Sequence, residues 1–372
     1  MGLMKKITAV KLVDILRSPT TLLSMNPREL SQIVAEARFY NMLAQLRWLC
    51  EQADVWFDLP VEFQRHVLSA EYTYTNQIRL LEQEHRHVST LFSQSGVRWV
   101  YLKGAAYQLS GFEYMRGRIM SDIDILVPQA QIETAEHALV AHGWMHKTMT
   151  DYDDKFYRNY SQEIPPLKHF DRQTELDVHF NILPSILRHG PDPVILHSHT
   201  QALSDDSGAR VLSPEAMVLH SVIHLFYESE FHKGVRDLFD IFQLIRHFSQ
   251  QPGFWDKLVR LQQSIGNGES MYYALRYCRQ YYQLDVPAEV LAFYEQFKPG
   301  PLVFRLIDPA FKKVFSSIYP VHHERGDQWY VFVLYLRGHL KRLPLSKLVP
   351  HLIRKGLYRL NPVKKDESDL MI

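Results

Sequence analysis

The stretch Trp99–Val127 constrains the fold of this chain more than any other part of the sequence. Its last seven residues, Ser121–Val127, alternate Asp122 and Asp124 with isoleucines. Side chains alternate between the two faces of a β-strand, so both carboxylates are expected on one face. Two adjacent like charges repel unless a cation lies between them, and Mg²⁺ prefers oxygen ligands of this kind. The stretch predicts a metal site or, as the alternative, an edge strand with a solvated acidic face.

The residues before this strand predict a phosphate-binding turn. Val97–Leu102 is a short apolar segment suited to a strand, and Ala105–Phe112 is suited to a helix. Gly104 therefore lies where a strand leads into the amino terminus of a helix. Such a terminus presents unpaired N–H groups and the positive end of the helix dipole, which together favour a phosphate.

A third candidate carboxylate lies further along the chain. In Thr174–Ile182, the polar residues Glu175, Asp177 and His179 alternate with apolar residues. This pattern is typical of a half-buried strand with its polar groups on one face. Asp177 completes the site begun by the paired aspartates if the two strands are neighbours. The alternative interpretation is a charged face exposed to solvent.

The order of periodic segments predicts an α+β fold with three regions. Residues 1–95 are expected to be helical, residues 96–212 to hold a small mixed β-sheet with helices, and residues 213–372 to be helical again, ending in a basic tail. Helical spacing in the first region covers Ile7–Leu16, Leu30–Leu49, Val61–Leu68 and Tyr72–Phe92, and two further strands are expected at Trp144–Thr150 and Pro166–Phe170.

The helical region that begins at Ser213 holds two other patterns. His220 and His224 have the i, i+4 spacing of some zinc sites, but the glutamate of a metalloprotease helix is absent, so no metal is expected there. Arg236 and Asp240 have the same spacing and are expected to form an ion pair along one helix.

Charge and composition limit the classes of partner. The net charge is +1, so only a local basic patch would attract a nucleic acid. Arg337–Lys365 has nine Lys and Arg residues and no Asp or Glu, which suits RNA phosphates, an anionic membrane surface or simply a solvated helix face. Cys50 and Cys278 lack the spacing of a disulfide framework or zinc ribbon. No apolar run is long enough for a membrane span, and a cytoplasmic location is expected.

At this point the sequence resembles a known family. The order of Leu102-Lys103-Gly104, Arg118, Ser121–Val127 and Glu175–His179 is similar to the bacterial "uncharacterised nucleotidyltransferase" family of the polymerase-β-like nucleotidyltransferase superfamily. The resemblance covers roughly residues 35–250. It implies a small mixed sheet backed by helices, with Mg²⁺ or Mn²⁺ as cofactor and an NTP, ATP among them, as substrate. The implied catalytic and metal-binding residues are Asp122, Asp124 and Asp177.

The phosphate-binding turn departs from the superfamily pattern. Many members have serine or a second glycine after the first glycine, whereas Ala105 follows Gly104 here and lacks a hydroxyl. Basic residues nearby are expected to supply the lost contact or to form ordinary ion pairs. The expected nucleotide- and phosphate-binding residues are Lys103, Gly104, Ala105, Arg116, Arg118 and Ser121, and the expected supporting residues behind the metal-binding carboxylates are Glu175 and His179.

These observations predict a metal-dependent nucleotidyltransferase that moves NMP from an NTP to a hydroxyl or phosphate acceptor on a small molecule, a protein or a tRNA. One alternative is a catalytically inactive protein that keeps the fold as a binding or regulatory module. Another is an RNA-binding protein that acts through Arg337–Lys365.

Overall fold

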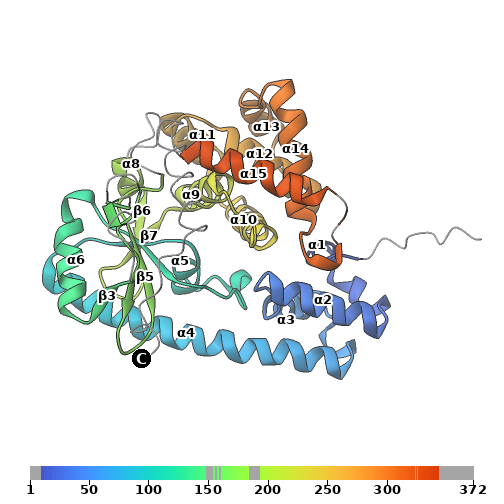
Figure 1. Ribbon diagram of the computed structural model, residues 1–372, viewed down its shortest axis with the longest axis horizontal. Coiled ribbons are helices and arrows are strands. Elements are labelled where there is room, and N and C mark those ends of the chain that lie inside the picture. Colours follow the sequence, from blue (N-terminus) through green and yellow to red (C-terminus); the bar gives the residue numbers. More distant parts are fainter. Residues whose placement is uncertain are drawn as a thin grey trace, which may run out of the picture.

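The chain folds as a single β-sheet embedded among helices, as the computed structural model shows (Figure 1). The structure describes residues 10–147, 154–155, 157–158, 161–183, 193–322, 324 and 326–342. One cluster of buried hydrophobic side chains runs through all three regions expected from the sequence. The α+β architecture predicted from the periodic segments is confirmed.

The sheet has seven strands in the order β3-β4-β5-β2-β1-β7-β6. Their bounds are β1 Val100–Tyr101, β2 Ile123–Leu126, β3 Trp144–His146, β4 Leu167–His169, β5 Glu175–His179, β6 Thr200–Ala202 and β7 Arg210–Leu212. The central strand β2 is parallel to β5 and antiparallel to β1. The sheet is therefore mixed, and the two strands that carry the aspartates are neighbours.

The amino-terminal helices are α1 Leu12–Arg17, α2 Pro27–Phe39, α3 Gln45–Gln52 and α4 Val61–Ser95. The prediction of one helix over Leu30–Leu49 is wrong, because the chain turns at Asn41, whose φ of +57° is one that Asn tolerates. The prediction of two separate helices, Val61–Leu68 and Tyr72–Phe92, is also wrong, because α4 is continuous through both. No Gly or Pro interrupts the 35 residues of α4, which ends at Gly96 in the left-handed conformation.

Some of the remaining helices flank the sheet, and the others pack together on one side of it (Figure 1). They are α5 Lys103–Leu109, α6 Ile132–Ala141, α8 Pro193–Ser198, α9 Pro214–Tyr227, α10 Gly234–Phe248, α11 Phe254–Ile265, α12 Glu269–Tyr282, α13 Ala288–Glu295, α14 Pro301–Ser316 and α15 Asp327–Arg342. In Figure 1, α6 lies on one side of the sheet and α5 and α9 lie on the other. The long helix α4 runs beneath the sheet and beneath α2 and α3.

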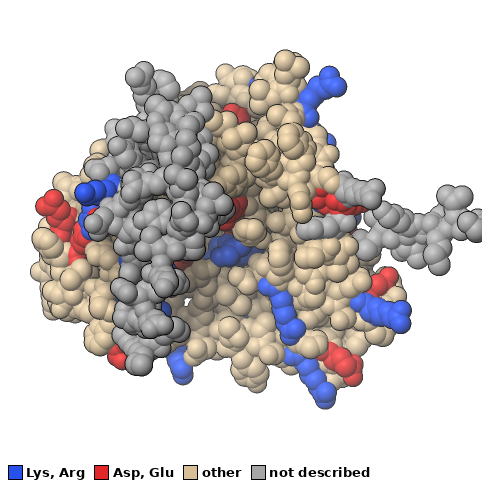
Figure 2. Space-filling model, in the orientation of Figure 1, with Lys and Arg blue, Asp and Glu red and all other residues tan. Residues whose placement is uncertain are grey.

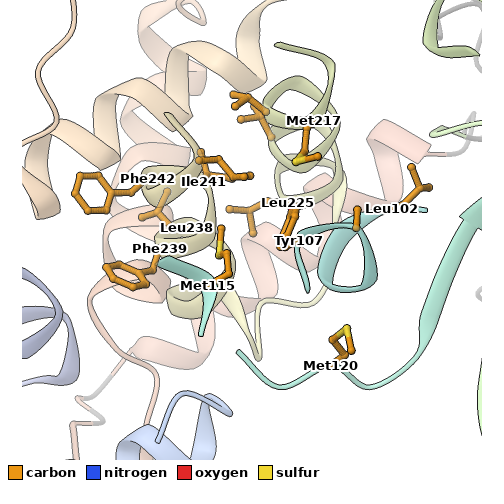
Figure 3. Packing of buried hydrophobic residues seen from close by; sticks show 14 of the residues in the cluster. Leu102, Tyr107, Met115, Met120, Met217, Leu225, Leu238, Phe239, Ile241 and Phe242 are labelled. Carbon is orange, nitrogen blue, oxygen red and sulfur yellow. The ribbon is translucent and has the colours of Figure 1, made fainter. Parts of the chain in front are cut away.

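Buried side chains fix α5 against two carboxyl-terminal helices. Tyr107 of α5, Leu225 of α9 and Leu238 of α10 point toward one another in the packed interior (Figure 3). Each is almost completely buried, so any displacement of one helix would open a cavity in the core. This packing holds the starts of α5 and α10 in a fixed relation.

Two strands, β6 and β7, were not expected from the sequence. Each has three residues, which is too short for a period of two to stand out. β7 pairs in parallel with β1 and so extends the sheet beyond the phosphate-binding turn.

Candidate active site

The register between β2 and β5 brings two aspartates together. Asp124 and Asp177 are direct partners across this parallel pair, so their side chains lie on the same face of the sheet. His179 is two residues further along β5 and shares that face. Asp122 immediately precedes β2 and lines a cavity together with Asp124. The expectation that the two strands are neighbours is thus confirmed.

The antiparallel pairing of β1 with β2 places Lys103 beside Asp124. The backbone N–H of Leu102 donates to the carbonyl oxygen of Asp124 at 3.0 Å, and the chain then turns into α5. Lys103 Nζ donates to Asp124 Oδ1 at 2.7 Å. The φ of Lys103 is +47°, which is uncommon for a residue with a side chain and persists only where the surroundings hold it.

His179 links two carboxylates. Its Nε2 lies 2.9 Å from Asp124 Oδ1, and its Nδ1 lies 3.1 Å from Glu163 Oε2. Burial alone would lower the pKa of His179, but Glu163 and Asp124 outweigh burial and raise it. For Asp124, burial opposes ionisation, yet Lys103 and His179 lower its pKa well below the ordinary value. Asp124 is therefore a fixed carboxylate with two donors on one oxygen.

Asp122 and Asp177 have no such compensation. Burial, and then the charge of Asp124, raise the pKa of both carboxyl groups, in the case of Asp177 to about 7. Among the described residues, no side chain forms an ion pair with either of them. At Asp122 the charges of Lys103, Lys233 and Arg118 offset only part of this rise, so a bound cation would favour the ionised form of both carboxyl groups.

This raised pKa predicts how the stability of the metal-free protein depends on pH. Between the ordinary pKa of 3.8 and about 7, the folded chain keeps a proton on Asp177 that the unfolded chain has released. Asp177 therefore lowers the free energy of unfolding as pH rises through that window, by at most about 1.4 kcal/mol per pH unit. Asp177→Asn is expected to gain stability relative to the wild type from about pH 4 to about pH 7. Urea midpoints across this range in EDTA would measure the gain, and a constant difference between the two proteins would contradict it.

A cavity of about 290 Å³ lies in front of this face. Its lining includes the carboxylates of Asp122 and Asp124 and four cationic side chains, those of Lys103, Arg118, Lys233 and Arg236. Figure 2 shows Lys and Arg side chains in a hollow near the middle of this side of the molecule, with acidic side chains beside them. A cavity with both charges suits a ligand that carries phosphates and a divalent cation.

Arg118 joins the cavity to the carboxyl-terminal helices. Its Nε donates to Asp240 Oδ2 at 2.7 Å, and both side chains are buried. The predicted pairing of Arg236 with Asp240 is therefore wrong: Arg236 instead binds Asp237 through two nitrogens, at 2.8 and 2.6 Å. The partner of Asp240 is thus Arg118, which comes from a distant segment of the chain, and not the residue four positions before it on the same helix.

Gly104 lets this guanidinium approach the turn at Lys103-Gly104. A Cβ atom at position 104 would lie 2.3 Å from Arg118 Nη1 and 2.5 Å from Met120 Cγ, so only glycine fits while Arg118 stays on Asp240. Gly104→Ala is expected to displace Arg118 and to weaken, roughly 10-fold, the ATP binding that the sequence predicts. Calorimetric titration would measure this change. Gly300→Ala is the matched control, because nothing lies within 4 Å of its added Cβ, and equal affinity in both variants would contradict the packing argument.

Other residues singled out in the sequence have different surroundings. Arg116 does not line the cavity and donates to Glu71 at 2.7 Å, so the structure favours an ordinary ion pair over a phosphate contact. Glu175 pairs with Lys147 at 2.6 Å rather than with the aspartates. Ala105 is buried directly after the turn, and Ser121 lines the cavity.

The histidine pair on α9 belongs to no group of three metal-ligand side chains among the described residues. Burial, with Lys103 nearby, lowers the pKa of His220 to about 3, and the ring centroids of His220 and His224 are 6.3 Å apart. Within the described part of the chain, no three His, Cys, Asp or Glu side chains are grouped as metal ligands in their present rotamers. Asp122 and Asp124 nevertheless both line the cavity, and Lys103 and His179 bind only Oδ1 of Asp124, so its Oδ2 is left for another partner.

The basic tail is described only at its start. Arg337 and Lys341 bind Glu269, and Arg342 binds Glu228, so these three cations are used within the molecule. Residues 343–372 lie outside the described residues, and RNA binding through them stays a prediction. None of the described helices has the length and hydropathy to cross a membrane.

Sequence reasoning missed Glu163 and Lys233. Glu163 lies in an irregular segment that pairs with the end of β5 by a single bridge, so no periodicity announces it. Lys233 directly precedes α10, where a cation lies at the unfavourable positive end of a helix dipole. A lysine at this unfavourable position was a signal from which a functional role of Lys233 could have been predicted.

Comparison with known proteins adds one finding. A family model described as "Uncharacterised nucleotidyltransferase" matches residues 24–283, which include the cavity and α9 to α12. No protein with a curated description and no solved structure matches the chain.

Proposed function

Because the chain belongs to the family of uncharacterised nucleotidyltransferases, we propose that it moves NMP from an NTP, ATP among them, to a hydroxyl or phosphate acceptor in a metal-dependent reaction. One observation carries the proposal. Asp124 and Asp177 are register partners on neighbouring strands, and Asp122 and Asp124 line a cavity that also holds four cations. Phosphoryl and nucleotidyl transfer depend mainly on such positioning and charge compensation.

The donor chemistry fits a hard divalent cation. Burial, and then the charge of Asp124, raise the pKa values of Asp122 and Asp177, and Asp124 supplies a third oxygen donor. When bound, Mg²⁺ or Mn²⁺ neutralises phosphate charge and acidifies an attacking hydroxyl. These three aspartates would hold it.

The other residues bind and orient the reactants. Lys103 and the free edge of Arg118 face the cavity and are placed to bind phosphate oxygens. His179 keeps Asp124 in position by bonding to it and to Glu163. Asp177, the register partner of Asp124 on β5, would help to hold the cation that acidifies the acceptor hydroxyl as its oxygen attacks the α-phosphorus.

Labelling in a cell extract tests the proposal. The protein is incubated with each α-labelled NTP and Mg²⁺ or Mn²⁺ in an extract that supplies acceptors. Transfer of label to an extract component, dependent on the protein and blocked by EDTA, is the expected result. Absence of labelled product with all four NTPs and both metals would count against transfer.

A second candidate function is that of a catalytically inactive member that binds or regulates a partner. Asp124 Oδ1 already accepts bonds from Lys103 and His179, and no three described ligands are grouped for a metal, which favours this candidate. Calorimetry with ATP, CTP, GTP and UTP separates the two functions. A pure scaffold gives no heat that depends on Mg²⁺, whereas an enzyme gives it with at least one NTP.

A further inference from the structure

Lys233 reaches from the carboxyl-terminal helices to the aspartate-bearing turn. It directly precedes α10 and lines the cavity, and its Nζ donates to Ser121 Oγ at 2.5 Å. Ser121 is the residue before Asp122. The side chain therefore spans the boundary between the sheet and the helices that cover it, at the point where the first aspartate enters the cavity.

Among the described residues that line this cavity, Lys233 is the cation that no carboxylate binds. The other three are all paired: Lys103 with Asp124, Arg118 with Asp240 and Arg236 with Asp237. The bonding partner of Lys233 is a neutral hydroxyl. A lysine with a neutral partner remains available for an anion, because a hydroxyl compensates little of its charge.

The surroundings of Lys233 add to the demand for an anion. Burial, and then the neighbouring charge of Arg236, lower the pKa of Lys233 by more than the charges of Asp122 and Asp237 raise it. Lys233 and Arg236 also lie in or next to the first turn of α10, where the helix dipole disfavours cations. A phosphate group in the cavity would offset both the repulsion between Lys233 and Arg236 and the unfavourable interaction of these cations with the helix dipole.

The order of the strands indicates which phosphates of an NTP would lie beside Lys233. Asp177 flanks Asp124 from β5, whereas Lys103 flanks Asp124 from β1, on the opposite side. Asp177 does not line the cavity that holds Lys103 and Lys233. In-line displacement at the α-phosphorus keeps the attacking and leaving oxygens on opposite sides. An acceptor near Asp177 thus places the leaving phosphates near Lys233.

We infer that Lys233 binds the β- and γ-phosphates of the NTP and the pyrophosphate that leaves, an inference that rests on the proposed function. In the transfer, the acceptor oxygen forms a bond to the α-phosphorus while the bond from that phosphorus to the bridging oxygen breaks. The electron pair of the broken bond goes to the pyrophosphate oxygen, where Lys233 compensates the new charge. The acceptor proton is released to solvent water.

Binding measurements on full-length Lys233→Met test this role. Inorganic pyrophosphate, ATP and AMP are each titrated in Mg²⁺ by calorimetry. The variant is expected to bind ATP and pyrophosphate about 10-fold to 100-fold more weakly, with AMP affinity unchanged, because AMP lacks the phosphates concerned. Lys233→Arg is expected to recover most of the affinity. Lys257→Met, an exposed lysine on α11 outside the cavity, is the matched control and should bind as the wild type does.

Each outcome has a distinct meaning. Wild-type affinity of Lys233→Met for ATP and pyrophosphate would overturn the inference and leave the proposed function standing. An equal loss for AMP would also overturn it, because the effect would then be structural. If the melting temperature of Lys233→Met falls, Lys233→Gln provides the same comparison with a polar side chain. A wild-type protein that binds neither ATP nor pyrophosphate would contradict both the inference and the proposed function.

Discussion

Asp122→Asn is expected to lower nucleotidyl transfer by at least about 10³-fold while the fold survives. The substitution keeps the shape of the side chain but removes the charge that a divalent cation needs. No described side chain forms an ion pair with Asp122, so no structural contact is lost. Relief of the repulsion from Asp124, which helps to raise the pKa of Asp122, should leave stability equal or slightly higher. Initial rates of label transfer and the melting temperature measure the two effects.

The matched control for this variant is Asp256→Asn. Asp256 is an exposed residue in the first turn of α11 and does not line the cavity. Its replacement should leave the transfer rate unchanged. Full activity of Asp122→Asn would exclude the proposed mechanism, because a cation-binding carboxylate at the cavity cannot be dispensable.

The largest expected effect on stability comes from Asp240→Asn, at about 3–5 kcal/mol of lost unfolding free energy. Asp240 and Arg118 are both almost fully buried, and their ion pair joins the segment before β2 to α10. Removal of the negative charge leaves the guanidinium of Arg118 buried without a counter-charge. Urea denaturation of the variant and the wild type measures the difference.

A double variant separates the loss of a counter-charge from a general packing defect. Arg118→Met combined with Asp240→Leu removes both charges and fills a similar volume, so it should recover most of the lost stability. If Asp240→Asn were as stable as the wild type, the buried ion pair would not be what holds α10 to the segment before β2. A double variant no better than the single one would assign the loss to packing.

The local patterns of the sequence predicted the aspartate-bearing strands well. Asp122, Asp124 and Asp177 lie in segments where apolar and polar residues alternate, and alternation depends only on neighbours along the chain. The break at Lys103-Gly104 and the helix that begins after Ser213 are signalled just as locally. The structure has strands at Ile123–Leu126 and Glu175–His179 and helices that begin at Lys103 and Pro214, where these local patterns predicted them.

Contacts between distant segments were beyond this kind of prediction. Arg118 and Asp240 are 122 residues apart, and Lys233 and Ser121 are 112 apart, so nothing in the spacing joins them. Helical spacing suggested an Arg236 pair with Asp240, but the demand of a buried guanidinium for a partner decided the pairing instead. Such choices depend on how α10 packs against α5, which the order of residues does not reveal.

The cavity depends on both the sheet and the carboxyl-terminal helices. Asp122 and Asp124 come from the sheet, whereas Lys233 and Arg236 come from the start of α10. The family match continues to residue 283 and so includes α10, which completes the cavity. A fragment that ends after β7 would lack half of the cationic lining.

The most direct measurement is diffraction from crystals grown with MnCl₂ and a non-hydrolysable NTP analogue, recorded for the anomalous signal of manganese. We expect the anomalous peak to place a manganese ion within bonding distance of carboxylate oxygens of Asp122 and Asp124, with the triphosphate of the analogue beside Lys233. A bound analogue with no manganese at these carboxylates, or with manganese at a different place, would contradict it.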